Sequence, residues 1–134
     1  TPLDIGITPL IITPGTKKYR AGYNQPFDRQ RELANKWIDD AQKLIFIGYG
    51  FNDDHLETHI RTRAKAGVPI LSISYSLTNN GRTLLQSTPS MIALEKSASG
   101  GVDGTAYSHS GTTTFLAKKS WWDLNFFIKE VLEP

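Results

Sequence analysis

The chain lacks cysteine altogether, which excludes disulfide bonds and metal sites built from thiolates. It also lacks any apolar run near the roughly 20 residues that a membrane-spanning helix needs. No secretory signal pattern is visible in the sequence. We therefore expect a cytoplasmic protein that has no membrane partner.

The chain also has little net charge, only +2 over 134 residues. Its lysines and arginines are scattered, whereas binding to a nucleic-acid backbone usually needs a concentrated basic face. A nucleic-acid partner is therefore not supported directly. The length fits one domain or part of a larger one. Because the sequence starts at Thr1 and soon enters the apolar stretch "TPLIITPG", we interpret residues 1–134 as part of a domain that begins upstream. A small protein that has been processed or trimmed at its N-terminus is the alternative.

Apolar residues at helical and strand spacing predict an α/β fold. Residues 10–12 are interpreted as a short buried strand between Pro9 and Pro14. A helix that Asp28 caps follows, because apolar residues recur three to four positions apart and polar residues fill most of the other positions. The apolar stripe of this helix consists of Leu33, Trp37, Ala41 and Leu44.

A βαβ crossover is predicted in the middle of the chain. Residues 44–47 have no polar interruption, which suits a parallel strand that helices cover on both faces. Asn52 or Asp53 caps the next helix, and Gly67 ends it. Residues 68–74 form the next strand, which implies a parallel pair with a right-handed connection. The inward stripe of the helix consists of Leu56, Ile60 and Ala64.

The rest of the chain is less regular. Residues 76–87 are predicted to be a loop leading into a short helix, and residues 91–94 and 112–117 to be strands. The glycine- and serine-rich residues 97–111 are predicted to be a loop. Ser120 and Asp123 resemble a capping box before a final helix. The inward residues of that helix are Leu124, Phe127, Ile128, Val131 and Leu132.

The turn after residues 44–47, in "LIFIGYGFNDDHLETHI", is the first candidate ligand site. Ligands of open parallel sheets bind at the carboxyl ends of strands, and a glycine there lets the backbone approach a phosphate near a helix N-terminus. However, Asp53 stands where the dinucleotide fingerprint has its third glycine. The carboxylates of Asp53 and Asp54 also suit the helix dipole by themselves. Spacing alone leaves both a nucleotide site and an ordinary strand-to-helix turn open.

The histidines are weaker candidates. His55 and His59 share a helix face, as zinc ligands can, but Glu57 lies one place later than the zinc-protease pattern requires. No third ligand is obviously placed, so surface or loop-facing histidines are the simpler interpretation. His109 lies between two serines, yet the sequence offers no carboxylate to orient it for nucleophilic catalysis. We assign neither a metal site nor a catalytic role to these residues.

The stretch "IGYGFNDDHL" resembles the C-terminal half of the bacterial sirtuin-like domains found in anti-phage defence proteins. Those domains often carry a strand ending in Gly-Tyr-Ser/Gly-Phe, followed by Asn/Ser-Asp and a His or similar residue. The segments "IITPGTKKYR", "KWIDDAQKLIFIGYG", "GVPILSISYSLTNN" and "WWDLNFFIKEVL" fit the same family. The resemblance therefore covers most of the chain.

The resemblance implies a Rossmann-like parallel sheet flanked by helices, incomplete without an upstream segment. In this family the two halves of the domain share the NAD site, and the glycine-rich loop and catalytic histidine lie in the N-terminal half. This sequence has neither, so no catalytic residue is assigned. At this strand end the family usually has an asparagine and an acid. Ser74 and Ser76 depart from that pattern, which leaves the implied ribose contact open. The implied NAD contacts are Gly48, Tyr49, Gly50, Phe51, Asn52 and Ser74.

For the complete protein, the resemblance implies hydrolysis of NAD during anti-phage defence, with nicotinamide as the leaving group. The implied partners are the upstream half of the same domain, further copies of the protein, and a HerA-type DNA-translocase ATPase. The alternative is a non-catalytic oligomerisation or DNA-associated assembly module. A deacylase is a third option, which the absence of cysteine disfavours because many such enzymes carry zinc-binding cysteines.

Overall fold

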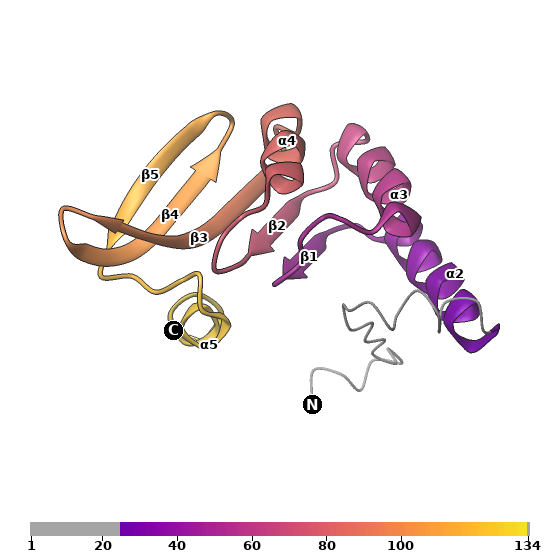
Figure 1. The fold of residues 1–134 in the computed structure, drawn as a ribbon, viewed down its shortest axis with the longest axis horizontal. Coiled ribbons are helices and arrows are strands. Elements are labelled where there is room, and N and C mark those ends of the chain that lie inside the picture. Colours follow the sequence, from indigo (N-terminus) through magenta and orange to yellow (C-terminus); the bar gives the residue numbers. More distant parts are fainter. Residues whose placement is uncertain (1–24, 134) are drawn as a thin grey trace.

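The computed structural model describes residues 25–133, which form an α/β fold around one five-stranded sheet (Figure 1). The predicted strand at residues 10–12 lies outside the described residues. In chain order the elements are α2 (Gln25–Asp40), β1 (Leu44–Ile47), α3 (Asp54–Lys65), β2 (Ile70–Ile73), α4 (Asn79–Ser87), β3 (Met91–Ser99), β4 (Val102–His109), β5 (Thr112–Ala117), α5 (Leu124–Phe127) and a π-helical turn, η1 (Ile128–Leu132).

The sheet is mixed, with the strand order β1-β2-β3-β4-β5. The first three strands are parallel, and α3 and α4 form the crossovers between them. The predicted βαβ crossover is therefore confirmed, and Leu44 of β1 pairs with Ile70 of β2. The last two strands run antiparallel to their neighbours, so the prediction of a parallel sheet is wrong beyond β3.

Residues 97–111, predicted to be a loop, belong mostly to a β-hairpin. The end of β3 pairs with β4 across a turn at Gly100 and Gly101, whose φ angles are +60° and +79°. Glycine adopts such angles without a steric penalty, and two in succession make the tight turn of a hairpin. A second turn, with Ser110 at φ +50° and Gly111 at +78°, leads into β5. Glycine and serine therefore mark two turns here.

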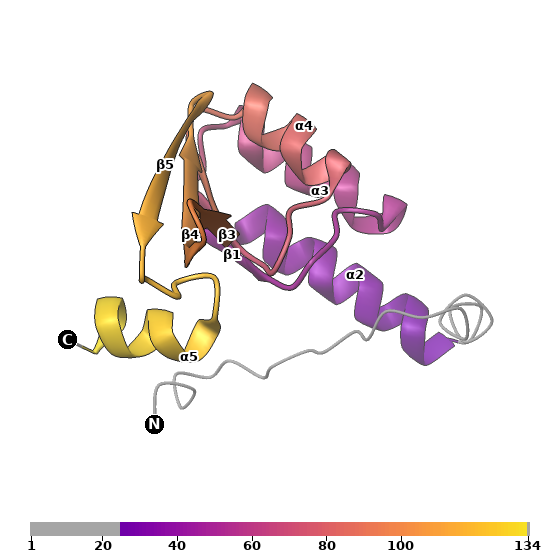
Figure 2. The same ribbon diagram turned by 60° about the vertical axis from the view of Figure 1, so that its left-hand side comes forward.

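Helices cover the two faces of the sheet unequally. Figure 2 shows α2, α3 and α4 together on one side of the sheet. That side holds the larger core, to which β2 contributes Ile70. Because successive strand residues point to opposite faces, Ile73 of β2 belongs instead to a smaller core on the other face, together with Leu94 and Phe127 of α5.

The helix α3 follows its sequence prediction. Ile60 and Ala64 are buried in the larger core, and Leu56 packs against it. Asp53 is the N-cap residue, and Gly67 follows the helix with a φ of +81°, as is common at helix ends. The predicted inward stripe and both predicted boundaries are confirmed.

The helix α2 buries a different face from the predicted one. Ile38 is buried, whereas Leu33 and Trp37 are each 42% exposed. Asp39 lies roughly on the side of the helix opposite Trp37. Its carboxylate contacts Nδ1 of His59 on α3 at 2.8 Å. The predicted stripe is wrong for Leu33 and Trp37, because α2 packs against α3 through the other flank.

One face and one edge of β1 are uncovered by the described residues. Leu44 and Phe46 pack against the larger core, but Ile45 and Ile47 are 60% and 54% exposed. β1 is the terminal strand of the sheet, and no strand within residues 25–133 pairs with its outer edge. A strand that is apolar on both faces was expected to be covered on both. This prediction is met on one face only.

The C-terminal helix is less buried than predicted. Its N-cap is Asp123, whose carboxylate accepts a hydrogen bond from the backbone N–H of Asn125 at 2.9 Å. Phe127 is buried, but Val131 and Leu132 are 39% and 61% exposed. The predicted inward stripe is confirmed for Phe127 and is wrong for Val131 and Leu132, which lie in the π-helical turn η1.

Candidate functional site

The candidate site lies where β1 and β2 end. Residues 48–52, here called the β1 loop, lead from β1 toward α3, and residues 74–78 lead from β2 to α4. Because β1 and β2 are parallel, both connections lie at the same edge of the sheet. The backbone N–H of Gly48 donates to the carbonyl of Ile73 at 2.8 Å. This bond holds the start of the β1 loop against the end of β2.

Phe51 anchors the β1 loop in the core. Its φ of +57° is left-handed, which is rare for a bulky residue. The ring is 1% exposed, and its centroid lies 5.1 Å from that of Phe46 and 4.8 Å from that of Tyr49. Such packing is what holds a residue in a strained backbone conformation. The ring of Phe51 is therefore a core group, and a ligand can meet only its backbone.

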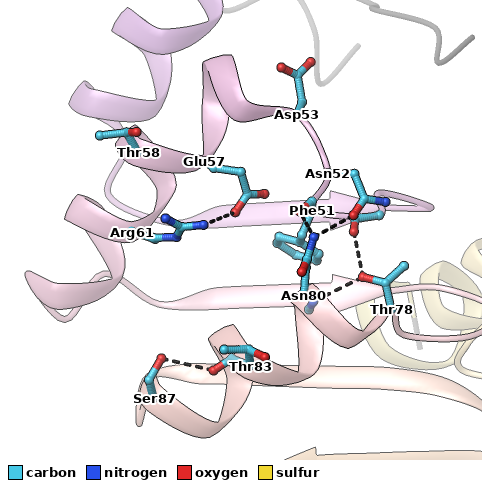
Figure 3. Close-up of polar contacts among 12 residues, drawn as sticks. Phe51, Asn52, Asp53, Glu57, Thr58, Arg61, Thr78, Asn80, Thr83 and Ser87 are labelled. Atoms are coloured by element: carbon cyan, nitrogen blue, oxygen red, sulfur yellow. Dashed lines mark hydrogen bonds and ion pairs between the residues drawn. The ribbon is translucent and has the colours of Figure 1, made fainter. Parts of the chain in front are cut away.

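Side chains at the start of α4 fasten the β1 loop (Figure 3). The hydroxyl of Thr78 donates to the carbonyl of Gly50 at 2.6 Å. The side-chain amide of Asn80 donates to the carbonyl of Phe51 at 3.1 Å and to Oδ1 of Asn52 at 2.7 Å. The loop therefore keeps its shape through bonds to the neighbouring strand connection, without help from a ligand.

The two glycines of the β1 loop have different surroundings. At Gly48, whose φ is +62°, an added Cβ atom would point into open space, so a ligand can approach the backbone there. At Gly50 an added Cβ atom would lie 2.8 Å from Nδ2 of Asn52 and 3.6 Å from Thr78. Nδ2 is the far end of a flexible side chain, so a Cβ atom at position 50 would require Asn52 to shift.

Ser74 lies at the end of β2, on the face that carries α3 and α4. It is 8% exposed, and its hydroxyl has no hydrogen-bond partner among the described residues. The hydroxyl of Ser72, two residues earlier on the same face, likewise has no hydrogen-bond partner among the described residues. Buried hydroxyls normally have a partner. The hydroxyl of Ser74 is therefore a candidate ligand contact.

The structure brings all six predicted NAD contacts to one edge of the sheet, but not all of their side chains face a ligand. Tyr49 packs against the larger core, and the ring of Phe51 is part of it. The groups left for a ligand are backbone atoms of the loop glycines, the side chain of Asn52 and the hydroxyl of Ser74. Gly48 and Asn52 are exposed, Tyr49 and Gly50 are half-buried, and Phe51 and Ser74 are buried.

Glu57 was not predicted to be part of the site. It is 7% exposed, and its carboxylate accepts from the hydroxyl of Tyr49 at 3.5 Å and from the guanidinium of Arg61 at 3.4 Å. Burial raises the pKa of Glu57, and the Arg61 charge partly opposes this shift. Burial and the nearby Glu57 charge likewise raise the pKa of Tyr49. The sequence signal for Glu57 was its position beside Leu56 and Ile60 on the inward side of α3.

The histidines have local contacts. His55 is exposed, and His59 pairs with Asp39 of α2 at 2.8 Å. His109 Nε2 lies 2.8 Å from the carbonyl of Pro89 and 3.4 Å from the hydroxyl of Ser110. Across residues 25–133, no three His, Cys, Asp or Glu side chains are grouped so that they could hold a metal ion.

Comparisons with known proteins leave the chain without an assigned family. No protein-family model, no curated protein and no solved structure matches it. None of the described helices is both long enough and apolar enough to span a lipid bilayer.

Proposed function

We infer that this chain is the C-terminal part of a sirtuin-like, Rossmann-like NAD-binding domain, and that the complete protein hydrolyses NAD in anti-phage defence. One observation carries the proposal. At the edge of the sheet where β1 and β2 end, hydrogen bonds join the two connections that follow these strands, and each connection leads into the N-terminus of a helix. Open α/β sheets bind ligands outside the carboxyl ends of their strands. Free N–H groups at a helix start suit a phosphate.

The groups at this edge match parts of a dinucleotide. The open space beside Gly48 admits a phosphate to the loop backbone. The amide of Asn52 and the unpartnered hydroxyl of Ser74 are hydrogen-bonding groups suited to ribose. The carboxylates of Asp53 and Asp54 follow directly, and Asp53 caps α3. Phosphates therefore fit best over Gly48, away from these carboxylates.

The proposal assigns no catalytic residue to this chain. An upstream half of the same domain supplies the catalytic machinery and covers β1, where Ile45 and Ile47 are exposed and no strand within residues 25–133 pairs with the outer edge. Self-association and a HerA-type DNA-translocase ATPase remain the proposed further partners. The cytoplasm is the proposed compartment, since NAD depletion acts there.

The test compares nicotinamide release from NAD by this chain alone and by this chain with an upstream half. We expect release only from the combination. Robust hydrolysis by the chain alone would contradict the assignment. In the combined protein, Asn52→Ala should weaken NAD binding about tenfold, the size expected for one or two lost hydrogen bonds. The matched control is Asn79→Ala, at an exposed asparagine that begins α4, which should bind NAD like the parent.

The uncovered side of β1 favours a second candidate function, a non-catalytic assembly module. An open strand edge with exposed isoleucines is a ready surface for pairing with another chain. Calorimetric titration with NAD separates the two functions, because an assembly module shows no heat even when the upstream half is present. Sedimentation of the parent and of Ile45→Lys then reports assembly. Loss of oligomers in Ile45→Lys, combined with no NAD binding, supports the module.

A further inference from the structure

A groove of about 270 Å³ runs between α3 and α4. Figure 3 shows Glu57 and Arg61 of α3 on one side and Thr83 and Ser87 of α4 on the other. Apolar surface comes from Ala64 and Leu84, which also belong to the larger core. The groove therefore combines a buried carboxylate with an apolar wall. It is separate from the predicted NAD contacts and from the other sites that the sequence suggested.

The carboxylate of Glu57 has unmet hydrogen-bonding capacity. An ionised carboxylate offers about four acceptor sites, and charge-assisted bonds to nitrogen are typically about 2.7–2.9 Å long. The bonds that the structure shows for Glu57, to Tyr49 and Arg61, are 3.5 and 3.4 Å long. A cationic N–H donor inside the groove would approach this carboxylate more closely than either of them.

The opposite wall also presents acceptors. The hydroxyl of Thr83 donates to the carbonyl of Asn79 at 3.0 Å, and that of Ser87 donates to the carbonyl of Thr83 at 3.2 Å. Each hydroxyl proton is used within α4, which leaves the oxygen lone pairs to accept. An ammonium group is therefore better matched to the interior of the groove than an anion is.

The mouth of the groove has the opposite charge. Arg61 and Lys65 line it one and two turns after Glu57 along α3. The side chain of Arg61 is 64% exposed, and its bond to Glu57 is long, so its guanidinium can turn from Glu57 to a ligand. These two cations would repel a simple amine, but they attract a carboxylate. The charges thus separate along the groove, acidic inside and basic at the mouth.

We propose that the α3–α4 groove binds a small zwitterion of the amino-acid class. The ammonium group of the ligand bonds to Glu57, its carboxylate bonds to Arg61 and Lys65, and its side chain lies on the apolar wall that includes Leu84. The site goes beyond the NAD proposal and does not depend on it. It adjoins the β1 loop, because Asn80 both lines the groove and bonds to Phe51.

The experiment titrates the isotopically labelled full chain with glycine, L-alanine, L-valine and L-leucine, and follows the backbone amides of α3 and α4 by NMR. We expect saturable shifts in both helices with at least one of the four. N-acetyl-L-leucine lacks the ammonium and 3-methylbutylamine lacks the carboxylate, so each should bind at least about tenfold more weakly than leucine. No saturable shift with any of the four, or equal binding of either analogue, overturns the proposal.

Variants locate the binding in the groove. Glu57→Gln keeps the shape of the side chain and should weaken binding about tenfold or more, as expected for a lost bond to a charged group. Lys65→Ala should also weaken it. Thr62→Ala, on the exposed side of α3, should bind like the parent. If Glu57→Gln does not fold, Lys65→Ala and the two leucine analogues decide. Unchanged binding in folded Glu57→Gln, or in Lys65→Ala, overturns the proposal.

Discussion

Replacing Phe51 by alanine should destabilise the protein far more than replacing Trp37, although tryptophan is the larger residue. The ring of Phe51 is 1% exposed and packs against two other rings, whereas Trp37 is 42% exposed. Truncating a buried phenylalanine removes transfer free energy and leaves a cavity, which together cost about 3–5 kcal/mol. A half-exposed side chain loses about 1–2 kcal/mol, because solvent already reaches much of it.

The assay is urea unfolding of the parent, Phe51→Ala and Trp37→Ala, followed by far-ultraviolet circular dichroism. This signal does not depend on the tryptophan that one variant removes. Equal m-values would show that the changes in midpoint report stability. At roughly 3–4 °C per kcal/mol for a chain of this size, Phe51→Ala should melt about 9–20 °C below the parent and Trp37→Ala about 3–8 °C below it.

Two outcomes would refute this reasoning. If Phe51→Ala loses less than about 1 kcal/mol, the ring is not part of the core and the left-handed backbone at that position needs another explanation. If Trp37→Ala loses as much as Phe51→Ala, Trp37 is buried in solution. In that second case the flank of α2 that carries Leu33 and Trp37 must be covered by something other than residues 25–133.

Three further substitutions test other parts of the structure. Gly104→Ala should cost at least about 2 kcal/mol or prevent folding, since an added Cβ would lie 2.2 Å from the backbone carbonyl of Leu116; a stable variant in thermal melts would mean that β4 and β5 pair differently. Asp53→Ala should cost about 1 kcal/mol by removing the cap of α3, and an unchanged urea midpoint would show that the cap is dispensable. Because burial raises the pKa of Glu57, the stability that its protonated form contributes is fully present below the ordinary carboxyl pKa and is lost as the pH rises through the raised pKa. Relative to the parent, Glu57→Gln should therefore gain stability as the pH rises from the acidic range toward neutrality. A stability difference in urea unfolding that does not change with pH would argue against the shift.

The sequence was a good guide wherever local spacing decides the structure. The helix α3 shows this best, because its cap at Asp53, its stripe through Ile60 and its end at Gly67 are all set by residues within the helix or beside it. The parallel pairing of β1 with β2 followed from the length of the intervening helix. The position of the candidate site at the ends of these strands followed from the same crossover.

The failures arose where one pattern allows two packings. Leu33 and Trp37 form a helical stripe, but the sequence does not say which flank of α2 meets α3. The glycines at 100 and 101 mark a turn as readily as a loop, and pairing with β3 decides between them. Spacing along α3 places Glu57 on the inward side of the helix. It cannot reveal the contact of Glu57 with Tyr49 of the β1 loop or the groove beside α4.

The strand β3 has two kinds of neighbour, and this division has a consequence for folding. Its pairing with β4 closes over the two-residue turn at Gly100 and Gly101, whereas its pairing with β2 spans the whole of α4. Hairpins close within microseconds, and contacts between distant residues form more slowly. The antiparallel strands β3, β4 and β5 are therefore able to pair first. The free edge of β3 then pairs with β2, and β2 with β1. On this order the candidate site is assembled last, because β1 is the last strand to pair.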